Sequence, residues 1–96
     1  QPVLELKEGR IQVTTVVRSR ERAKERILEE MERRVGTRPI SVSVFHAVAL
    51  DEAQELAQRV RQRFQCVESW IVEFTPVVGV HTGPGSLGVA FCLKDA

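Results

Sequence analysis

The spacing of hydrophobic residues changes along the chain, and it predicts two strands, a helix, a strand, a second helix and two further strands. At the start, Val3–Leu6 and Ile11–Val17 are rich in apolar and β-branched residues, and the polar Lys7–Arg10 between them contains a glycine. Two such runs joined by a short glycine-containing turn are typical of a β-hairpin. We therefore expect the chain to open with two antiparallel strands.

The first helix is indicated by apolar residues that recur every three or four positions after Ser19. Ser19 is a favourable N-cap residue, and Glu21 puts a negative charge in the first turn. Gly36 and Pro39 end the pattern, as helix-terminating residues do. The apolar stripe is Ala23, Ile27, Leu28, Met31 and Val35, and the ion pairs expected one turn apart are Glu29–Arg33 and Glu30–Arg34.

A second amphipathic helix is expected to begin at Asp51. Gln54 follows three positions later, which is the spacing of a capping box. Apolar residues then recur at helical spacing, so one side of this helix faces a core. Its apolar stripe is Ala53, Leu56, Ala57, Val60 and Phe64.

The remaining segments alternate with a period of two, which is typical of half-buried strands. In the last strand the opposite side carries only small residues, which suits the close approach of another group. The apolar sides are Ile40, Val42 and Val44 in one strand, Trp70, Val72 and Phe74 in the next, and Leu87, Val89, Phe91 and Leu93 in the last; the small residues are Gly88, Ala90 and Cys92.

This order of elements predicts an α/β fold, a two-layer α/β sandwich. Its sheet should be mixed, with about five strands, and both helices should cover one face. Each strand–helix–strand segment should form a right-handed parallel crossover. Since two helices cover only one face, we expect the other face to be partly polar or to pack on a missing partner. The 96 residues form a single domain, 1–96.

The composition of the chain reduces the number of function classes to consider. The net charge is +1, which argues against a dedicated nucleic-acid-binding protein. No apolar run approaches the ~18 residues of a membrane span. The chain has two cysteines and no visible signal peptide, which favours free thiols and a cytoplasmic location over a disulfide scaffold. It begins with Gln1 rather than methionine, and we expect it to be a fragment of a longer protein.

The candidate site is the glycine-rich segment Gly79–Gly88, which holds four of the six glycines and one of the two histidines, His81. Glycine lets the backbone approach a ligand closely, so this clustering favours a binding role for His81 over a surface histidine. Thr82 and Ser86 can add hydroxyl donors. Gly83–Gly88 matches G-x-G-x-x-G, but a strand follows it instead of a helix, which excludes a dinucleotide fingerprint.

Three other groups of residues in the sequence are candidates for binding or chemistry. His46 ends the middle strand, where α/β sites gather, and a solvated histidine is an equally good interpretation. The two cysteines and two histidines lack zinc-ligand spacing, so no metal is expected. Arg18, Arg20 and Arg22 form a basic cluster that could bind an anion, although interleaved glutamates favour a solvated face.

Four segments together resemble the C-terminal domain of the DegV family, bacterial fatty-acid-binding proteins that include subunits of fatty acid kinase. The match runs nearly end to end and keeps its order, and the histidine- and glycine-containing segment is its most specific part. The segments are Pro2–Ile11, Val17–Ala23, Val44–Ala47 and Pro76–Phe91.

The resemblance implies a two-domain parent that holds a long-chain fatty acid between this domain and a missing N-terminal domain. It implies that His81 lies near the carboxylate, and that Arg18 lies near the head group or the kinase contact. With Thr82, Gly83 and Gly85 these are the predicted ligand-binding residues. It further implies no chemistry by the domain itself and no cofactor: the bound acid is presented to a kinase subunit.

Two functions other than fatty-acid binding remain compatible with the sequence. Small α/β domains also serve as small-molecule regulatory or oligomerisation domains, by analogy of fold only. The second alternative is an enzyme that uses His81 as a general base, although no nucleophile or orienting carboxylate stands out in the sequence.

Overall fold

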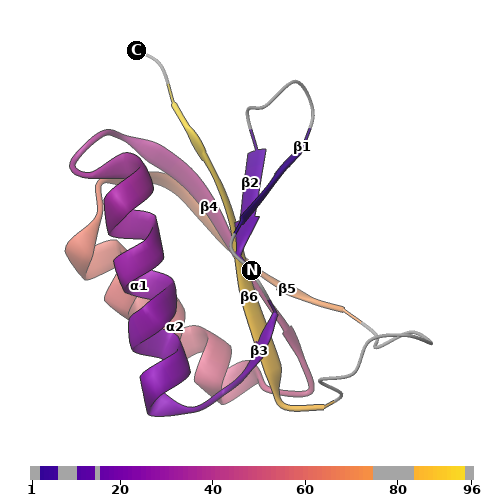
Figure 1. Cartoon of the computed structure of the whole chain (residues 1–96). Helices are drawn as coiled ribbons and strands as arrows, with labels where there is room; N and C mark the ends of the chain where they lie inside the picture. Colours follow the sequence, from indigo (N-terminus) through magenta and orange to yellow (C-terminus); the bar gives the residue numbers. More distant parts are fainter. Residues whose placement is uncertain (1–2, 7–10, 15, 75–83, 95–96) are drawn as a thin grey trace.

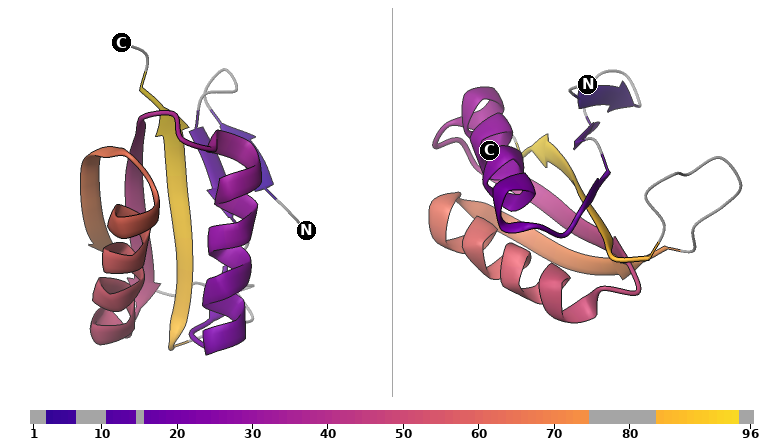
Figure 2. Two further views of the ribbon diagram at one scale, coloured as in Figure 1. Left: turned by 90° about the vertical axis from the view of Figure 1, so that its left-hand side faces the viewer. Right: turned by 60° about the horizontal axis from the view of Figure 1, so that its bottom comes forward.

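The computed structural model of the chain describes residues 3–6, 11–14, 16–74 and 84–94. It confirms the predicted two-layer α/β sandwich: two helices lie side by side on one face of a mixed sheet (Figures 1 and 2). The strands are β1 (Val3–Leu6), β2 (Ile11–Thr14), β3 (Val17–Arg18), β4 (Ile40–Ala47), β5 (Cys66–Glu73) and β6 (Ser86–Leu93), and the helices are α1 (Glu21–Val35) and α2 (Leu50–Arg63).

The sheet has the order β1-β2-β6-β4-β5, with β3 also paired to β6. Only β4 and β5 pair in parallel, and the other pairs are antiparallel. The parallel connection expected through α2 is therefore confirmed between neighbouring strands. Around α1 the expected crossover skips a strand, because β6 inserts between β2 and β4 and runs against both.

The N-terminal hairpin is confirmed, since β1 and β2 pair antiparallel. The prediction of one strand over Ile11–Val17 is wrong, because β2 ends at Thr14 and β3 is separate. Thr14 is buried, and its Oγ1 accepts a hydrogen bond of 2.9 Å from the Val89 N–H in β6. The threonine hydroxyl thus takes the place of a main-chain partner where the strand is interrupted.

Both helices begin without the predicted side-chain caps. Arg20, one residue after Ser19, is the N-cap of α1, and neither helix has a side-chain cap hydrogen bond. In α2 the N-cap is Ala49, so Asp51 lies inside the first turn. The C-terminal prediction for α1 is confirmed: Gly36 has a φ of 58°, and its N–H bonds the Glu32 carbonyl at 3.0 Å.

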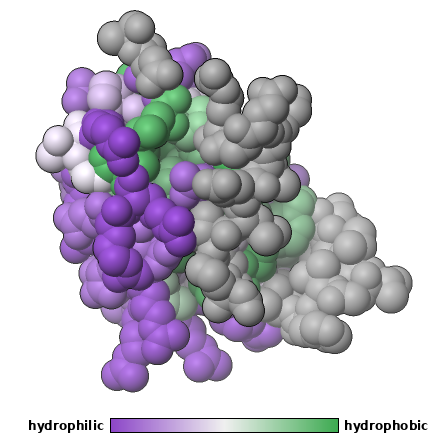
Figure 3. All heavy atoms as spheres, turned by 45° about the horizontal axis from the view of Figure 1, so that its top comes forward, coloured by the Kyte–Doolittle hydropathy of each residue, from purple (hydrophilic) through white to green (hydrophobic). Residues whose placement is uncertain are grey.

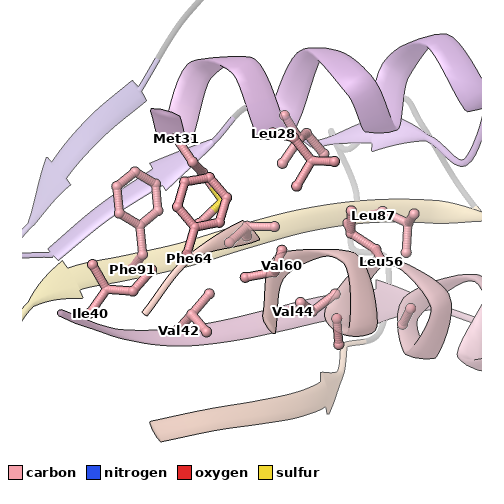
Figure 4. Packing of buried hydrophobic residues seen from close by; sticks show 14 of the residues in the cluster. Leu28, Met31, Ile40, Val42, Val44, Leu56, Val60, Phe64, Leu87 and Phe91 are labelled. Carbon is pink, nitrogen blue, oxygen red and sulfur yellow. The ribbon is translucent and has the colours of Figure 1, made fainter. Parts of the chain in front are cut away.

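The core lies between the two helices and the sheet (Figure 4). Apolar faces predicted for β4 and β6 are buried as expected, although Leu93 at the end of β6 is exposed. The buried set includes Leu28 and Met31 of α1, Leu56 and Val60 of α2, Ile40, Val42 and Val44 of β4, and Leu87, Val89 and Phe91 of β6.

The helices are also joined by charge. Lys24 of α1 is buried to 4% exposure and pairs with Glu52 and Glu55 of α2. Arg59 of α2 reaches back to Glu21 of α1 at 2.7 Å. Of the ion pairs predicted within α1, Glu30–Arg34 is present at 3.1 Å, whereas Arg33 pairs with Glu30 in place of Glu29. The two carboxylate oxygens of Glu30 thus pair with both arginines.

Candidate functional site

The face of the sheet opposite the helices, called the open face below, carries large apolar side chains. Trp70 and Val72 of β5 are 49% and 46% exposed. The registry places Trp70 beside Ser43, and Val72 beside Phe45, on the side of β4 away from the core. In Figure 3 hydrophilic side chains gather on the left, where the helices lie, and hydrophobic ones appear to the right of them.

The sequence predicts that this face is partly polar or packs on a missing partner. It predicts an apolar side of β5 formed by Trp70 and Val72 without saying which layer that side meets. The strand begins four residues before the predicted Trp70, at Cys66, and it is Ile71 that packs on the core. The available signal was the unbroken apolar run Trp70, Ile71 and Val72, because a strand with apolar residues on both sides is expected to be covered on both.

A shallow groove of about 180 Å³ runs across the open face. Small side chains, serine hydroxyls and larger apolar groups, Trp70 among them, line this groove. Its lining is Ile11, Ser41, Val42, Ser43, Trp70, Ala90, Phe91 and Cys92. Two of the three small residues predicted to allow a close approach, Ala90 and Cys92, thus lie in this groove.

The third small residue, Gly88, is explained inside the domain. A Cβ at Gly88 would lie 2.4 Å from two ring atoms of Phe45, so the phenyl ring lies directly over the glycine. The same ring meets Phe74 edge to face, with centroids 5.6 Å apart. The absent side chain at position 88 is therefore filled by an aromatic ring of the neighbouring strand β4.

Gly85 joins three elements at one end of the sheet. Its N–H donates to the Ala47 carbonyl at 2.7 Å, and its carbonyl accepts from the Ser19 N–H at 2.9 Å. Its φ of 88° is a conformation that favours glycine. Phe74 N–H donates to the His46 carbonyl at 2.8 Å nearby. The end of β4 thus bonds residues on both sides of 75–83 in the chain.

Arg18 lies at the same end of the sheet. Its partner across the β3–β6 pair is Ser86, which follows Gly85 directly. This register puts Arg18 on the open face, because its neighbour Val17 packs on the core. The structure therefore brings together two of the predicted ligand-binding residues, Arg18 and Gly85. The other three, His81, Thr82 and Gly83, lie outside the described residues.

Two further sequence interpretations change. Ser86, considered as a hydroxyl donor, is fully buried. His46 is 4% exposed, so the interpretation of a solvated histidine is wrong. Its Nδ1 accepts a hydrogen bond of 3.0 Å from the Ala49 N–H, the N-cap of α2. The imidazole therefore satisfies the main-chain N–H of the N-cap residue itself, and no side chain caps the first turn of α2 as Asp51 was expected to. Arg20 and Arg22 are exposed at the start of α1.

Other chemistry is limited in the part of the chain that the structure describes. Among those residues no group of three or more histidine, cysteine, aspartate or glutamate side chains is placed to hold a metal ion. None of the described helices combines the length and hydrophobicity that crossing a bilayer requires. Cys66 and Cys92 are free thiols. Burial raises the pKa of the Cys66 thiol, which makes it a poor nucleophile.

These features define a class: a two-layer α/β domain with an apolar open face. At one end of that face lies Arg18, opposite Ser86, and this place is called the basic corner below. The chain belongs to the DegV family, since the family model described as "Uncharacterised protein, DegV family" matches residues 1–94. The family resemblance drawn from the sequence is thereby confirmed.

Curated relatives carry the same domain within longer chains. A DegV domain-containing protein of Streptomyces coelicolor is 39% identical over 90 residues, which are 93% of this chain and 32% of the relative. One from Clostridium perfringens is 36% identical over 95 residues, 98% of this chain and 33% of the relative. The chain thus spans about a third of the length of these relatives.

Two solved structures from Thermotoga maritima share the fold, with TM-scores of 0.70 and 0.71 at 22% and 21% sequence identity. The matches cover 88% and 90% of this chain and 35% of each neighbour. The first neighbour is described as a hypothetical protein whose structure reveals a fatty acid binding function, and the second as a DegV lipid binding protein.

Proposed function

We propose that this chain is one part of a cytoplasmic fatty-acid-binding protein. With a second domain it encloses a long-chain fatty acid and presents the carboxylate to a kinase partner, and it carries out no reaction itself. The ligand class is supported by the two fold neighbours described as binding fatty acid and lipid. A second domain is supported by relatives about three times as long as this chain.

The observation that carries the proposal is the open face. Trp70 and Val72 are about half exposed there, although large apolar side chains gain free energy from leaving water. Both helices lie on the other side of the sheet (Figure 2). An acyl chain held between this face and a second domain removes that surface from water.

The dimensions of the open face suit a long acyl chain. From Ser86 at the basic corner to Cys92 in the groove, β6 advances six residues, or about 20 Å. The hydrocarbon core of a bilayer is about 30 Å thick, so one leaflet of acyl chains occupies about 15 Å. Burying ten methylenes contributes about 8 kcal/mol, which corresponds to a dissociation constant near 1 μM.

The head group belongs at the end where Arg18 and Gly85 meet. A guanidinium is a strong partner for a carboxylate, and Arg18 shares the open face with the acyl surface. His81, Thr82 and Gly83 precede Gly85 in the same glycine-rich segment, and His81 adds a further donor. A head group at this end leaves the tail to run toward Trp70.

The test uses the full-length protein that contains this domain, purified from cells and extracted for lipid mass spectrometry. We expect a co-purified long-chain fatty acid at close to one per protein. Ala90→Phe should fill the groove and lower acyl affinity at least tenfold. Gln58→Phe, which adds the same ring on the exposed side of α2, should leave affinity unchanged. Absence of fatty acid from the extract and from titrations would refute the proposal.

A second set of variants tests the head-group end. Arg18→Gln and His81→Ala should each weaken binding of the fatty acid by about tenfold, the effect of losing one charge-assisted hydrogen bond. Binding of the corresponding fatty alcohol, which lacks the carboxylate, should change little. Equal losses for acid and alcohol would show that these side chains do not contact the carboxylate.

A further inference from the structure

On the helix side of the sheet, at the ends of β4 and β5, lies a hollow of about 670 Å³ that the lipid site does not use. We propose that this hollow, called the acidic hollow below, binds an arginine or lysine side chain of a partner protein. The inference stands apart from the proposed function. Its described lining is His46, Val48, Ala49, Leu50, Asp51, Glu52, Ile71 and Glu73, which includes three carboxylates but neither lysine nor arginine.

The charge of the acidic hollow is only partly neutralised. Glu52 is paired with Lys24 of α1. Asp51 and Glu73 are exposed, and neither has an ion pair within the described residues. Two carboxylates at the mouth of one hollow attract a cation and repel an anionic head group. A guanidinium or an ammonium group is a cation that such carboxylates bind through charge-assisted hydrogen bonds.

His46 supplies an independent sign of a ligand. The side chain is 96% buried and lines the acidic hollow. Its Nδ1 accepts from the Ala49 N–H, which fixes the proton of the neutral ring on Nε2. No described residue accepts a hydrogen bond from that Nε2–H. A main-chain carbonyl of a bound segment is a suitable acceptor.

The walls suit the rest of a basic side chain. Val48 and Leu50 are 70% and 51% exposed at the mouth, and Ile71 lies deeper. Arginine and lysine carry an apolar stem below the charge, and such stems pack along apolar surface while the head meets carboxylates. An apolar rim with two carboxylates and one donor therefore matches a basic residue within a peptide chain.

The acidic hollow and the basic corner are separate sites. Arg18 lies on the open face. Glu73 ends the edge strand β5 and, like Ile71 two residues before it, lies on the helix side of the sheet. From β3 through β6 and β4 to β5 there are three strand spacings, about 14 Å. One end of the sheet thus offers a positive group on one face and negative groups on the other.

The experiment titrates the full-length protein with Nα-acetyl-arginine amide and follows the histidine ring and Ala49 amide signals by NMR. The citrulline analogue has the same shape without the charge. We expect saturable shifts at His46 and Ala49 with the arginine compound only. Glu73→Gln and Asp51→Asn should each weaken binding about threefold. Glu68→Gln, at the other end of β5, is the matched control and should change nothing.

A further variant separates the donor from the turn. His46→Asn keeps an acceptor near the Nδ1 position and loses the Nε2–H, so it should weaken binding while the Ala49 amide keeps its hydrogen bond. No saturable shift, equal binding of the citrulline compound, or equal weakening by Glu68→Gln overturns the proposal. So does displacement of the arginine compound by Ca²⁺, or binding of anionic phospholipid vesicles that Glu73→Gln reduces.

Discussion

The ring of Phe45 over Gly88 gives the sharpest prediction of stability. In Gly88→Ala the new methyl group would lie 2.4 Å from Cε1 and Cζ of that ring. Carbon atoms pack at 3.5–4.0 Å, so the ring must move by about 1 Å or more. It then leaves the strand surface and its edge-to-face contact with Phe74, a contact that contributes about 0.5–1.5 kcal/mol.

We expect Gly88→Ala to lower the free energy of unfolding by about 1–2 kcal/mol, although alanine is otherwise favoured over glycine in a strand. For a domain of this size that is about 5–15 °C in Tm. Urea unfolding of the wild type, Gly88→Ala, Phe45→Ala and the double variant forms a double-mutant cycle. With Phe45 removed, Gly88→Ala should become neutral or stabilising. An equal loss of stability in both backgrounds would refute the reasoning.

Three further predictions rest on single contacts. Thr14→Val should cost about 1–3 kcal/mol in urea unfolding, because a buried N–H in β6 loses its acceptor, whereas Thr14→Ser should retain most of the stability. The hydrogen bond from Lys24 lowers the pKa of Glu55, so this pair stabilises the fold above pH 4.5 and the contribution is lost as pH falls through the lowered pKa. Lys24→Met should flatten the acid limb of urea midpoints against pH, and an unchanged slope would contradict this. In the full-length protein, oleate should slow alkylation of Cys92, which lines the groove, but not of Cys66, and mass mapping of iodoacetamide adducts checks both.

The layers of this fold could be predicted because they depend on local periodicity. Apolar residues at every second position of β4 and at helical spacing in α1 are the residues that the core buries, as with Val42 and Met31. The order of strands in the sheet could not be predicted in this way, because it depends on which strands distant in the sequence pair with one another. Nothing in the sequence near Ser86 tells that β6 lies between β2 and β4.

The predicted starts of the two helices are wrong for a related reason. Ser19 and Asp51 have side chains that can cap a helix, but the N-caps are Arg20 and Ala49. The Ala49 N–H is bonded by the ring of His46, a residue of the preceding strand, which is a contact that the local sequence pattern does not contain. Similarly, the closeness of Arg18 and Gly85 follows from the pairing of β3 with β6, which the local pattern does not predict.

The central place of β6 has a consequence for biosynthesis. This strand follows all the others in the sequence, yet it pairs with β2, β3 and β4. When the ribosome makes β6, the hairpin and the β4–α2–β5 unit have already been synthesised, each with an edge that only β6 will pair. The nascent domain is therefore most exposed to chaperones and to mispairing until its final strand is released.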